Sequence, residues 1–336
     1  MLKIRKRKGS RKLRWGVAGL GAFSEHSVIP NLLLIRKIKL ESVFSHSPQR
    51  AKAIASKYFI PGNYSDYKEF LNSNIDVVYI GSRNSDHYEQ VILAAKAGKH
   101  ILCDKPLSVT AEEAEEMVRV CRENNVQLAV NFVYRFHPLT IKLKEILDSG
   151  LIGTIINIQG QFATNFLPGD NFRYDKKTGG GGALRDLAPH VLDLFRFLGG
   201  EIKEIAGCVD NLVYKTEVDD FAAGMVRFEK GHYGYFNVAF CVPRAFNRLE
   251  ITGSKGSISI DNLISGKFPY SAKMIIVLEG EIKKAFGKRG NKLNKLIKSV
   301  NSSFLKNQVP TVTGQDGLVV MKLMEELEEK CLLNRK

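Results

Sequence analysis

The sequence predicts an α/β protein with two domains: a first domain built on a parallel sheet, and an α+β second domain with a large, mostly antiparallel sheet. At 336 residues the chain is longer than a single hydrophobic core usually supports. Short strand-like and helical runs alternate up to residue 135, and longer alternating strands follow. We therefore expect a basic tail at 1–12, a first domain at 13–135 and a second domain at 136–332.

Short apolar strands alternate with helices in the first domain, which is typical of parallel βαβ units. Thr110 begins the last of these helices, because Glu113 gives the spacing of a capping box. The other expected strands lie at 13–18, 39–44, 75–80 and 100–103, and the other helices at 22–35, 48–58 and 86–97.

Longer runs with alternating apolar and polar residues dominate the second domain, which indicates antiparallel pairing with one face open to solvent. Helices are expected at 138–149 and 314–332, and strands at 154–164, 205–214, 219–229, 232–241 and 247–252.

Composition and charge narrow the class of protein. The chain is 44% hydrophobic and 25% charged, as in soluble globular proteins, and it contains no apolar stretch long enough to span a membrane. The net charge of +15 is confined to 1–14, with eight basic residues, and 283–298, with seven, and neither segment contains an acidic residue. A solvated tail is the simpler interpretation, so no specific nucleic-acid binding is expected, although adhesion to an anionic surface stays open.

Cysteine usage favours the cytoplasm. The five cysteines are far apart and form no C-x-x-C pair, so we expect reduced thiols, no disulfide framework and no metal site. The basic tail is followed by no apolar stretch of the kind a secretory signal carries.

A glycine turn follows the first strand and opens the first helix. Gly19 and Gly21 allow a tight turn and the close approach of a pyrophosphate to a helix N-terminus, and Ala22, Phe23 and Ser24 continue this segment. This context is typical of a Rossmann dinucleotide-binding domain. An ordinary tight turn is the alternative.

The end of the second strand bears on the choice of cofactor. An acidic residue there usually grips the ribose of NAD, but this strand is followed by Ser45 and His46, with Arg50 one turn later. These three side chains could accommodate a 2′-phosphate, so we favour NADP and leave NAD open. Alternatively, they form a solvated loop and helix cap.

Lys105 lies just past a short apolar strand, at the sheet edge where parallel α/β sheets bind ligands. Pro106 favours an extended conformation at this lysine. A cation held there could act on a substrate, although most strand-end lysines are simply solvated.

Asp186 and His190 are spaced to share one face of a helix, directly after the glycines at 179–182. Pro189 fits this helix if it begins near Asp186, because first-turn N–H groups have no intrahelical partner. Such a pair is more often structural than catalytic, but the glycines and the distant lysine favour a catalytic role.

Taken together, these motifs resemble the Gfo/Idh/MocA family, named for glucose-fructose oxidoreductase, inositol dehydrogenase and a rhizopine-catabolism protein. The resemblance runs from about residue 13 to 332. Three local departures stand out: Asp104 replaces the usual glutamate before the lysine, Ser82-Arg83 replaces threonine-proline, and Leu187-Ala188-Pro189 separates the Asp–His pair where a glycine is usual. The matching segments are the turn at Gly19 and Gly21 and the runs 79–87, 97–106, 131–138 and 180–194.

The resemblance implies an NAD(P)-dependent oxidoreductase acting on a secondary hydroxyl or ketone of a sugar, cyclitol or sugar derivative. His190 would accept the proton, Lys105 would stabilise alkoxide character, and Asp186 would orient His190 or take part in proton transfer. These three residues would also contact the substrate, together with Arg135, Asn165 and Arg173. The resemblance also assigns the following residues to the cofactor site: Ser82, Asn84, His87, Asp104, Lys105 and Asn131.

Two other functions stay open: a cofactor-dependent glycosidase, and a cofactor-sensing binding protein without catalysis. Relatives commonly pair the open sheet face of the second domain, so a homodimer or homotetramer is expected. Val238 and Phe240 are apolar positions that we expect to be exposed on that face.

Overall fold

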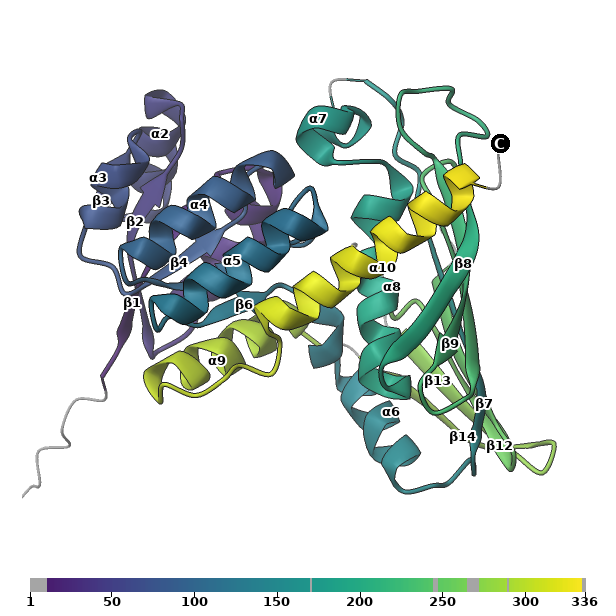
Figure 1. Ribbon diagram of the computed structural model, residues 1–336. Coiled ribbons are helices and arrows are strands. Elements are labelled where there is room, and N and C mark those ends of the chain that lie inside the picture. Colours follow the sequence, from purple (N-terminus) through teal and green to yellow (C-terminus); the bar gives the residue numbers. More distant parts are fainter. Residues whose placement is uncertain (1–10, 170, 244–246, 265–271, 289, 334–336) are drawn as a thin grey trace, which may run out of the picture.

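Two sheets form the framework of the computed structural model, one in each predicted domain (Figure 1). The structure describes residues 11–169, 171–243, 247–264, 272–288 and 290–333. Residues 1–10 of the predicted basic tail lie outside this part of the chain. The fold class is confirmed, since a parallel six-stranded sheet precedes a mostly antiparallel eight-stranded sheet.

The first sheet is entirely parallel, in the order β3-β2-β1-β4-β5-β6. The strand order reverses between β1 and β4, and ligands of open α/β sheets bind beside such a point, at the carboxyl ends of the strands. The strands are β1 Leu13–Ala18, β2 Ile38–Phe44, β3 Gly62–Tyr64, β4 Val77–Ile80, β5 His100–Cys103 and β6 Leu128–Val130.

Helices connect these strands largely as predicted. The expected capping box is present, because Thr110 accepts from the backbone N–H of Glu113 and the glutamate side chain reaches back. The helix expected at 22–35 differs: it begins as the π-helical turn η1 Ser24–Val28 and continues as α1 Ile29–Leu33. The remaining helices are α2 Pro48–Tyr58, α3 Tyr67–Asn72, α4 Asn84–Lys96 and α5 Ala111–Glu123.

The second sheet has the order β14-β13-β12-β11-β7-β10-β9-β8, in which only β7 and β10 pair in parallel. Helix α8 Ala183–Gly199 packs on one face, against β7, β9 and β10 (Figure 1). The strands are β7 Ile155–Ala163, β8 Ile202–Asp210, β9 Phe221–Phe228, β10 Tyr233–Ala239, β11 Asn247–Gly253, β12 Gly256–Asp261, β13 Ala272–Leu278 and β14 Glu281–Lys288.

Two expectations about this domain are wrong. Val238 and Phe240 are fully buried, because their side chains lie on the face that α8 covers. The open face instead carries Met225, Tyr233 and Tyr235, which alternate with the buried positions. Helix α8 begins three residues before Asp186, so Pro189 lies inside the helix and not in its first turn.

Short helices link the two domains. Helix η2 Val133–Phe136 leads from the first sheet into α6 Pro138–Asp148, and η3 Phe172–Tyr174 and α7 Lys176–Gly179 precede α8. They place the start of α8 opposite the carboxyl edge of the first sheet, where α7 contacts α4.

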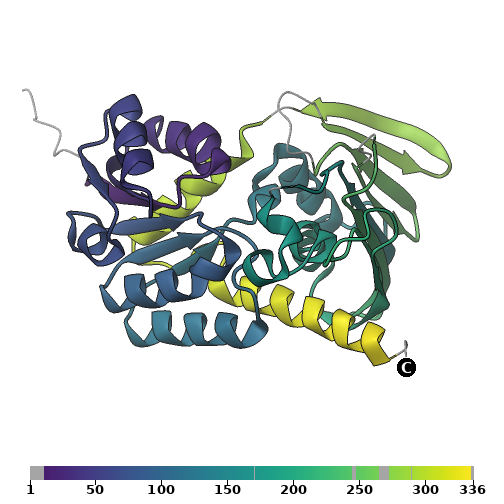
Figure 2. The same cartoon turned by 90° about the horizontal axis from the view of Figure 1, so that it is seen from above.

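The last two helices return to the first domain. In α9 Lys292–Leu305, Asn301 accepts a 2.9 Å hydrogen bond from the indole of Trp15, whose ring also stacks on Phe304. Helix α10 Gly314–Leu333 contacts α5 and β6 in the first domain and α8 and β8 in the second (Figure 2). Chain from beyond residue 135 therefore completes the packing around the first sheet.

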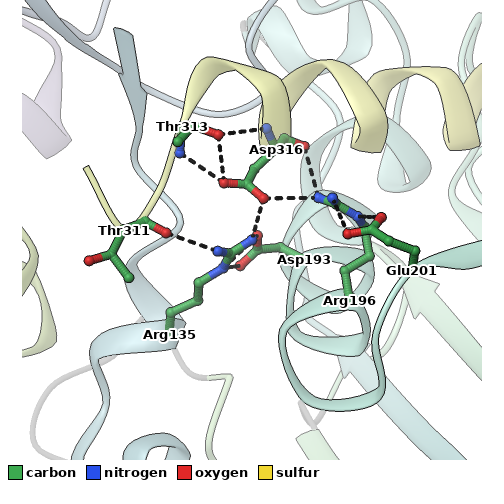
Figure 3. Close-up of polar contacts among 7 residues, drawn as sticks. All are labelled: Arg135, Asp193, Arg196, Glu201, Thr311, Thr313 and Asp316. Carbon is green, nitrogen blue, oxygen red and sulfur yellow. Dashed lines mark hydrogen bonds and ion pairs between the residues drawn. The ribbon is translucent and has the colours of Figure 1, made fainter. Parts of the chain in front are cut away.

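A buried ionic cluster fastens α10 to both domains (Figure 3). Arg135 of η2 lies 2.6 Å from Asp193 of α8 and 3.0 Å from Asp316 at the start of α10. Arg196 contacts Asp316 and Glu201. Burial raises the pKa of Asp193 to about 6 against the opposing charge of Arg135, so the carboxylate is still ionised at neutral pH.

Candidate active site

Lys105 and Asp186, which are 81 residues apart in the sequence, lie next to each other in the structure. Lys105 lies two residues beyond β5, and its Nζ is 2.7 Å from Oδ1 of Asp186 and 2.6 Å from the backbone oxygen of the same residue. The two side chains are only 14% and 11% exposed. A cation is therefore fixed at the carboxyl edge of the first sheet.

The second carboxylate oxygen of Asp186 accepts a 3.1 Å hydrogen bond from Nε of Arg173. Burial alone would raise the pKa of Asp186, but the charges of Lys105 and Arg173 hold it well below its usual range. The guanidinium of Arg173 also lies over the rings of Phe166 and Phe172. Asp186 is thus an ionised anchor for two cations.

His190 lies one helical turn beyond Asp186 on α8. Its imidazole meets the ring of Tyr134 at right angles, with 4.7 Å between ring centroids, and Phe162 lies on another side. Burial, and then the charge of Lys105, lowers the pKa of His190 well below its ordinary value. The imidazole is therefore neutral at physiological pH and able to accept a proton.

The predicted contact between Asp186 and His190 takes a different form. The hydrogen bonds of the Asp186 carboxylate go to Lys105 and Arg173, and Nδ1 of His190 is buried without a hydrogen-bond partner among the described residues. Asp186 acts on His190 through its charge, which raises the pKa of the imidazole against the effect of Lys105.

Asp104 holds the backbone that presents Lys105. Its Oδ1 accepts from the Lys105 N–H at 2.8 Å and from Nδ2 of Asn131 at 3.2 Å, and its Oδ2 accepts from the Tyr79 hydroxyl at 3.0 Å. No functional role was predicted for Tyr79, because an aromatic residue in a buried strand is usually part of the hydrophobic core. Its position beside the strand-end motif was the one available signal.

The glycine turn has the shape that a dinucleotide needs. Gly19 has a φ of +83°, and a Cβ there would lie 2.3 Å from the backbone nitrogen of Ser82. A Cβ on Gly21 would meet nothing within 4 Å. Ala22 and Phe23 are exposed beside it, and Ser24 is buried at the start of η1. The turn is tight on its inner side and open on its outer side, where a pyrophosphate would lie.

Arg50 is fixed next to this turn by Glu25, a residue that sequence reasoning missed. The guanidinium donates to the backbone oxygen of Leu20 and lies 2.5 Å from Glu25, which also pairs with Lys57 at 2.7 Å. Hydrogen bonds from Lys57 and Arg50 lower the pKa of Glu25 to about 2. Two cations therefore share one carboxylate at the predicted ribose end.

The other residues predicted to bind the cofactor near this end are accessible or partly so. The hydroxyl of Ser45 accepts from the backbone N–H of Ser47, whose own side chain caps α2. His46 is exposed and packs edge-on against Phe44.

Two of the remaining residues predicted to bind the cofactor have a buried polar side-chain atom that makes no hydrogen bond within the described residues. Oδ1 of Asn131 and Nε2 of His87 are buried without partners among the described residues, while Nδ1 of His87 lies 3.0 Å from the oxygen of Pro106. Such orphaned atoms fit a polar ligand such as the amide of a nicotinamide. Ser82 bonds Gln90, and Asn84 donates to the Gly179 oxygen, which ties α4 to α7.

Two predicted substrate residues make their hydrogen bonds with partners other than Lys105 and Asp186. Arg135 makes its hydrogen bonds within the buried cluster, to Asp193, Asp316 and the Thr311 oxygen. Asn165 is exposed and accepts from the Tyr214 hydroxyl. Of the predicted substrate-binding residues, Arg173 contacts Asp186 directly.

A parallel sheet with an open glycine turn, beside a fixed lysine and a neutral histidine, defines a dinucleotide-dependent oxidoreductase class of protein. The comparisons agree. Residues 13–132 match the model described as the oxidoreductase family with an NAD-binding Rossmann fold, and residues 140–259 match the GFO/IDH/MocA C-terminal domain. The chain belongs to the Gfo/Idh/MocA family.

One relative in sequence and two solved structures with the same fold are similar to this chain. The 1,5-anhydro-D-fructose reductase of Ensifer adhaerens is 29% identical over 91% of this chain and 92% of its own. Levoglucosan dehydrogenase, solved with NADH and levoglucosan, superposes with a TM-score of 0.86 at 22% identity, covering 96% of this chain and 98% of its own. A 3-ketoreductase from Actinomadura kijaniata, solved with NADP, gives 0.85 at 22% identity, with 95% and 98% covered.

Two negative findings apply to the described residues. No helix there combines the length and hydropathy needed to cross a lipid bilayer. Within the same part of the chain, no group of three or more histidine, cysteine, aspartate or glutamate side chains is arranged to hold a metal ion.

Proposed function

We propose that this protein is an NAD(P)-dependent oxidoreductase that transfers a hydride between nicotinamide and a secondary hydroxyl or ketone of a sugar, cyclitol or sugar derivative. The single observation that carries the proposal is the ion pair of Lys105 with Asp186, one helical turn before the neutral His190, at the carboxyl edge of the dinucleotide-binding sheet. The names of its relatives, which include a sugar reductase and a sugar dehydrogenase, support the substrate class.

A bound nicotinamide would supply or accept the hydride. In the oxidation direction, neutral His190 takes the hydroxyl proton, and the Lys105 ammonium stabilises the alkoxide that forms. Asp186 holds the Lys105 ammonium in place through its 2.7 Å ion pair. The Lys105 ammonium has three N–H donors, and the backbone oxygen and one carboxylate oxygen of Asp186 accept from two of them. The third donor can therefore bond a substrate oxygen while both contacts with Asp186 remain. Arg173 is then placed to read a further substrate oxygen.

The cofactor is proposed to be NADP in preference to NAD, because Arg50 and Lys57 share a single carboxylate beside the glycine turn. Arg50→Ala should weaken NADP binding about ten- to a hundredfold and NAD binding by much less, since a charge-assisted bond to phosphate contributes roughly 1.5–3 kcal/mol. Fluorescence titration with both dinucleotides measures this. Lys52→Ala, which removes an exposed cation of the same helix, is the control. Equal losses for NAD and NADP would remove Arg50 from phosphate recognition.

A second copy of the chain is the proposed partner for the open face of the second sheet, giving a homodimer or homotetramer. Met225, Tyr233 and Tyr235 are 59%, 48% and 46% exposed, and they neighbour one another on β9 and β10. Tyr235→Glu should shift the protein to monomer in sedimentation velocity, because a charge would be buried in the contact. Leu212→Glu, at an exposed apolar residue outside the sheet, should change nothing. A wild-type monomer at high concentration would contradict the pairing.

Location in the cytoplasm is also proposed. The proposal is supported by the five widely spaced cysteines, which form no C-x-x-C pair in the sequence.

A further inference from the structure

Lys292 occupies an unusual place for a cation. It is the first residue of α9, where the helix dipole disfavours positive charge, and its side chain is half-buried. Its Nζ lies 4.4 Å from the centroid of the Tyr134 ring. An ammonium over the face of an aromatic ring is stabilised by the ring quadrupole. The ring therefore helps to hold a charge that the helix terminus alone would repel.

The same ring contacts His190. The imidazole and the Tyr134 ring are perpendicular, with centroids 4.7 Å apart, so the edge of one ring meets the face of the other. Lys292, Tyr134 and His190 come from α9, η2 and α8, three elements that are far apart in the sequence. Helix α9 packs on η2, and η2 packs on α8, so the three side chains form one continuous stack.

We propose that Lys292 is a positioning residue of this site, acting on His190 through the ring of Tyr134. The proposal deepens the proposed function, on which the catalytic meaning of His190 rests. The cation fixes the ring that the imidazole packs against, and its charge disfavours the imidazolium form. Lys292 thereby keeps His190 neutral and ready to accept a proton.

The charges around the stack support this direction. Lys292 contributes to lowering the pKa of His190, after burial and Lys105, while Asp186 acts in the opposite sense. Burial lowers the pKa of His137, with further contributions from Lys292 and Lys295, to about 4. Two histidines that flank η2 thus experience the same cation. The groups that face His190 are Lys105 after β5, Asp186 on α8, Tyr134 on η2, Phe162 on β7 and Lys292 on α9.

Burial also makes Lys292 itself titrate in an accessible range, because its pKa is lowered to about 8. When the ammonium loses its proton near this pH, the ring of Tyr134 loses the cation above it. The His190 imidazole then loses a repulsive charge. The NMR signals of the Tyr134 and His190 rings should therefore change when Lys292 loses its proton.

The experiment follows the ring carbon signals of His190 and Tyr134 by NMR in the substrate-free protein, with His190→Gln and Tyr134→Phe used for assignment. We expect both signals to show an inflection near pH 8 in the wild type. Lys292→Met should abolish the inflection, and Lys292→Arg should move it out of the measured range, because arginine keeps its charge. Lys295→Met removes the exposed lysine of the next turn and should leave both signals unchanged.

Kinetics provides the second readout. In the oxidation direction, Lys292→Met should move the acid limb of the kcat/KM profile to higher pH by about one unit, because this cation no longer disfavours the imidazolium form of His190. Lys292→Arg should restore the wild-type limb. If Lys292 had a purely structural role, Lys292→Met would lower the amount of active enzyme or raise KM, and the acid limb of the kcat/KM profile would stay at the same pH.

The proposal fails if the wild-type rings show no inflection near pH 8, or if the inflection persists in Lys292→Met. The wild-type titration decides even if the methionine variant does not fold. Failure of the proposed function would look different: the inflection would be present, but no sugar or cyclitol would be turned over.

Discussion

Lys105→Ala should lower turnover about a thousandfold while leaving dinucleotide affinity within a few fold. A unit charge about 4 Å from a developing alkoxide contributes roughly 4 kcal/mol at an effective dielectric of about 20, which corresponds to about three powers of ten in rate. The charge acts on the oxygen that changes during the reaction, so its loss is felt in kcat more than in binding. Steady-state kinetics and a cofactor titration separate the two quantities.

Two controls frame this prediction. Lys96→Ala removes an exposed lysine from α4 and should leave kcat unchanged. Asp186 retains Arg173 as a partner in the Lys105 variant, so thermal unfolding should shift little. Near-normal turnover in Lys105→Ala would exclude this lysine from the mechanism.

The second large effect concerns stability. Arg135→Met should lower the free energy of unfolding by about 3–5 kcal/mol, because it leaves the buried carboxylate of Asp193 without its cation. Asp193 is 1% exposed, and Nη2 of Arg135 lies 2.6 Å from its Oδ1. The cluster in Figure 3 also joins η2 and α8 to the start of α10, so the loss should loosen both domains together. Urea unfolding measures the change.

Arg248→Met is the matched control, since Arg248 pairs with Glu250 and Asp261 at a partly exposed position. The loss there should be within about 1 kcal/mol. If both variants lost the same small amount, the buried cluster would not be what fastens α10. A double variant, Arg135→Met with Asp193→Leu, should recover part of the lost stability, because no unpaired charge is left buried.

The features that could be predicted from the sequence are those that depend on residues close together along the chain. The turn at Gly19 and Gly21 carries its own backbone requirement, so its role could be inferred from order along the chain. Lys105 and Asp186 could each be placed on an element end, and only the resemblance suggested that the two meet. The structure places them 2.7 Å apart.

Partners that lie far apart in the sequence could not be foreseen. Asp316 lies 181 residues from Arg135, and no local pattern links them, so the sequence did not indicate that Arg135 bonds Asp193 and Asp316 in a buried cluster. In the sequence Glu25 resembles any charged residue of a helix, and only the structure shows its ion pairs with Arg50 and Lys57. Strands β12, β13 and β14 were not predicted; β14 is exposed along nearly all its length and lacks the alternation of a half-buried strand.

The structure shows how two residues that depart from the family pattern, Asp104 and Pro189, are accommodated. Asp104 has a shorter reach than the usual glutamate, and the Tyr79 hydroxyl and the Asn131 amide come close enough to hold it. Pro189 sits inside α8, directly before His190, where it removes one backbone donor from the helix. Neither feature changes the fold, but both shape the surroundings of the proposed catalytic pair.

The most direct test of the account is a spectrophotometric screen of monosaccharides, cyclitols and nucleotide sugars with NADP and NAD, followed at the absorbance band of the reduced nicotinamide. The account predicts a net rise in absorbance with at least one such substrate, matched by an equal amount of ketone, and its loss in Lys105→Ala and His190→Ala. Cleavage of a glycoside with no net change in the band would indicate instead a hydrolase that restores its cofactor in each cycle. Cofactor binding without turnover of any of these compounds would contradict the oxidoreductase function.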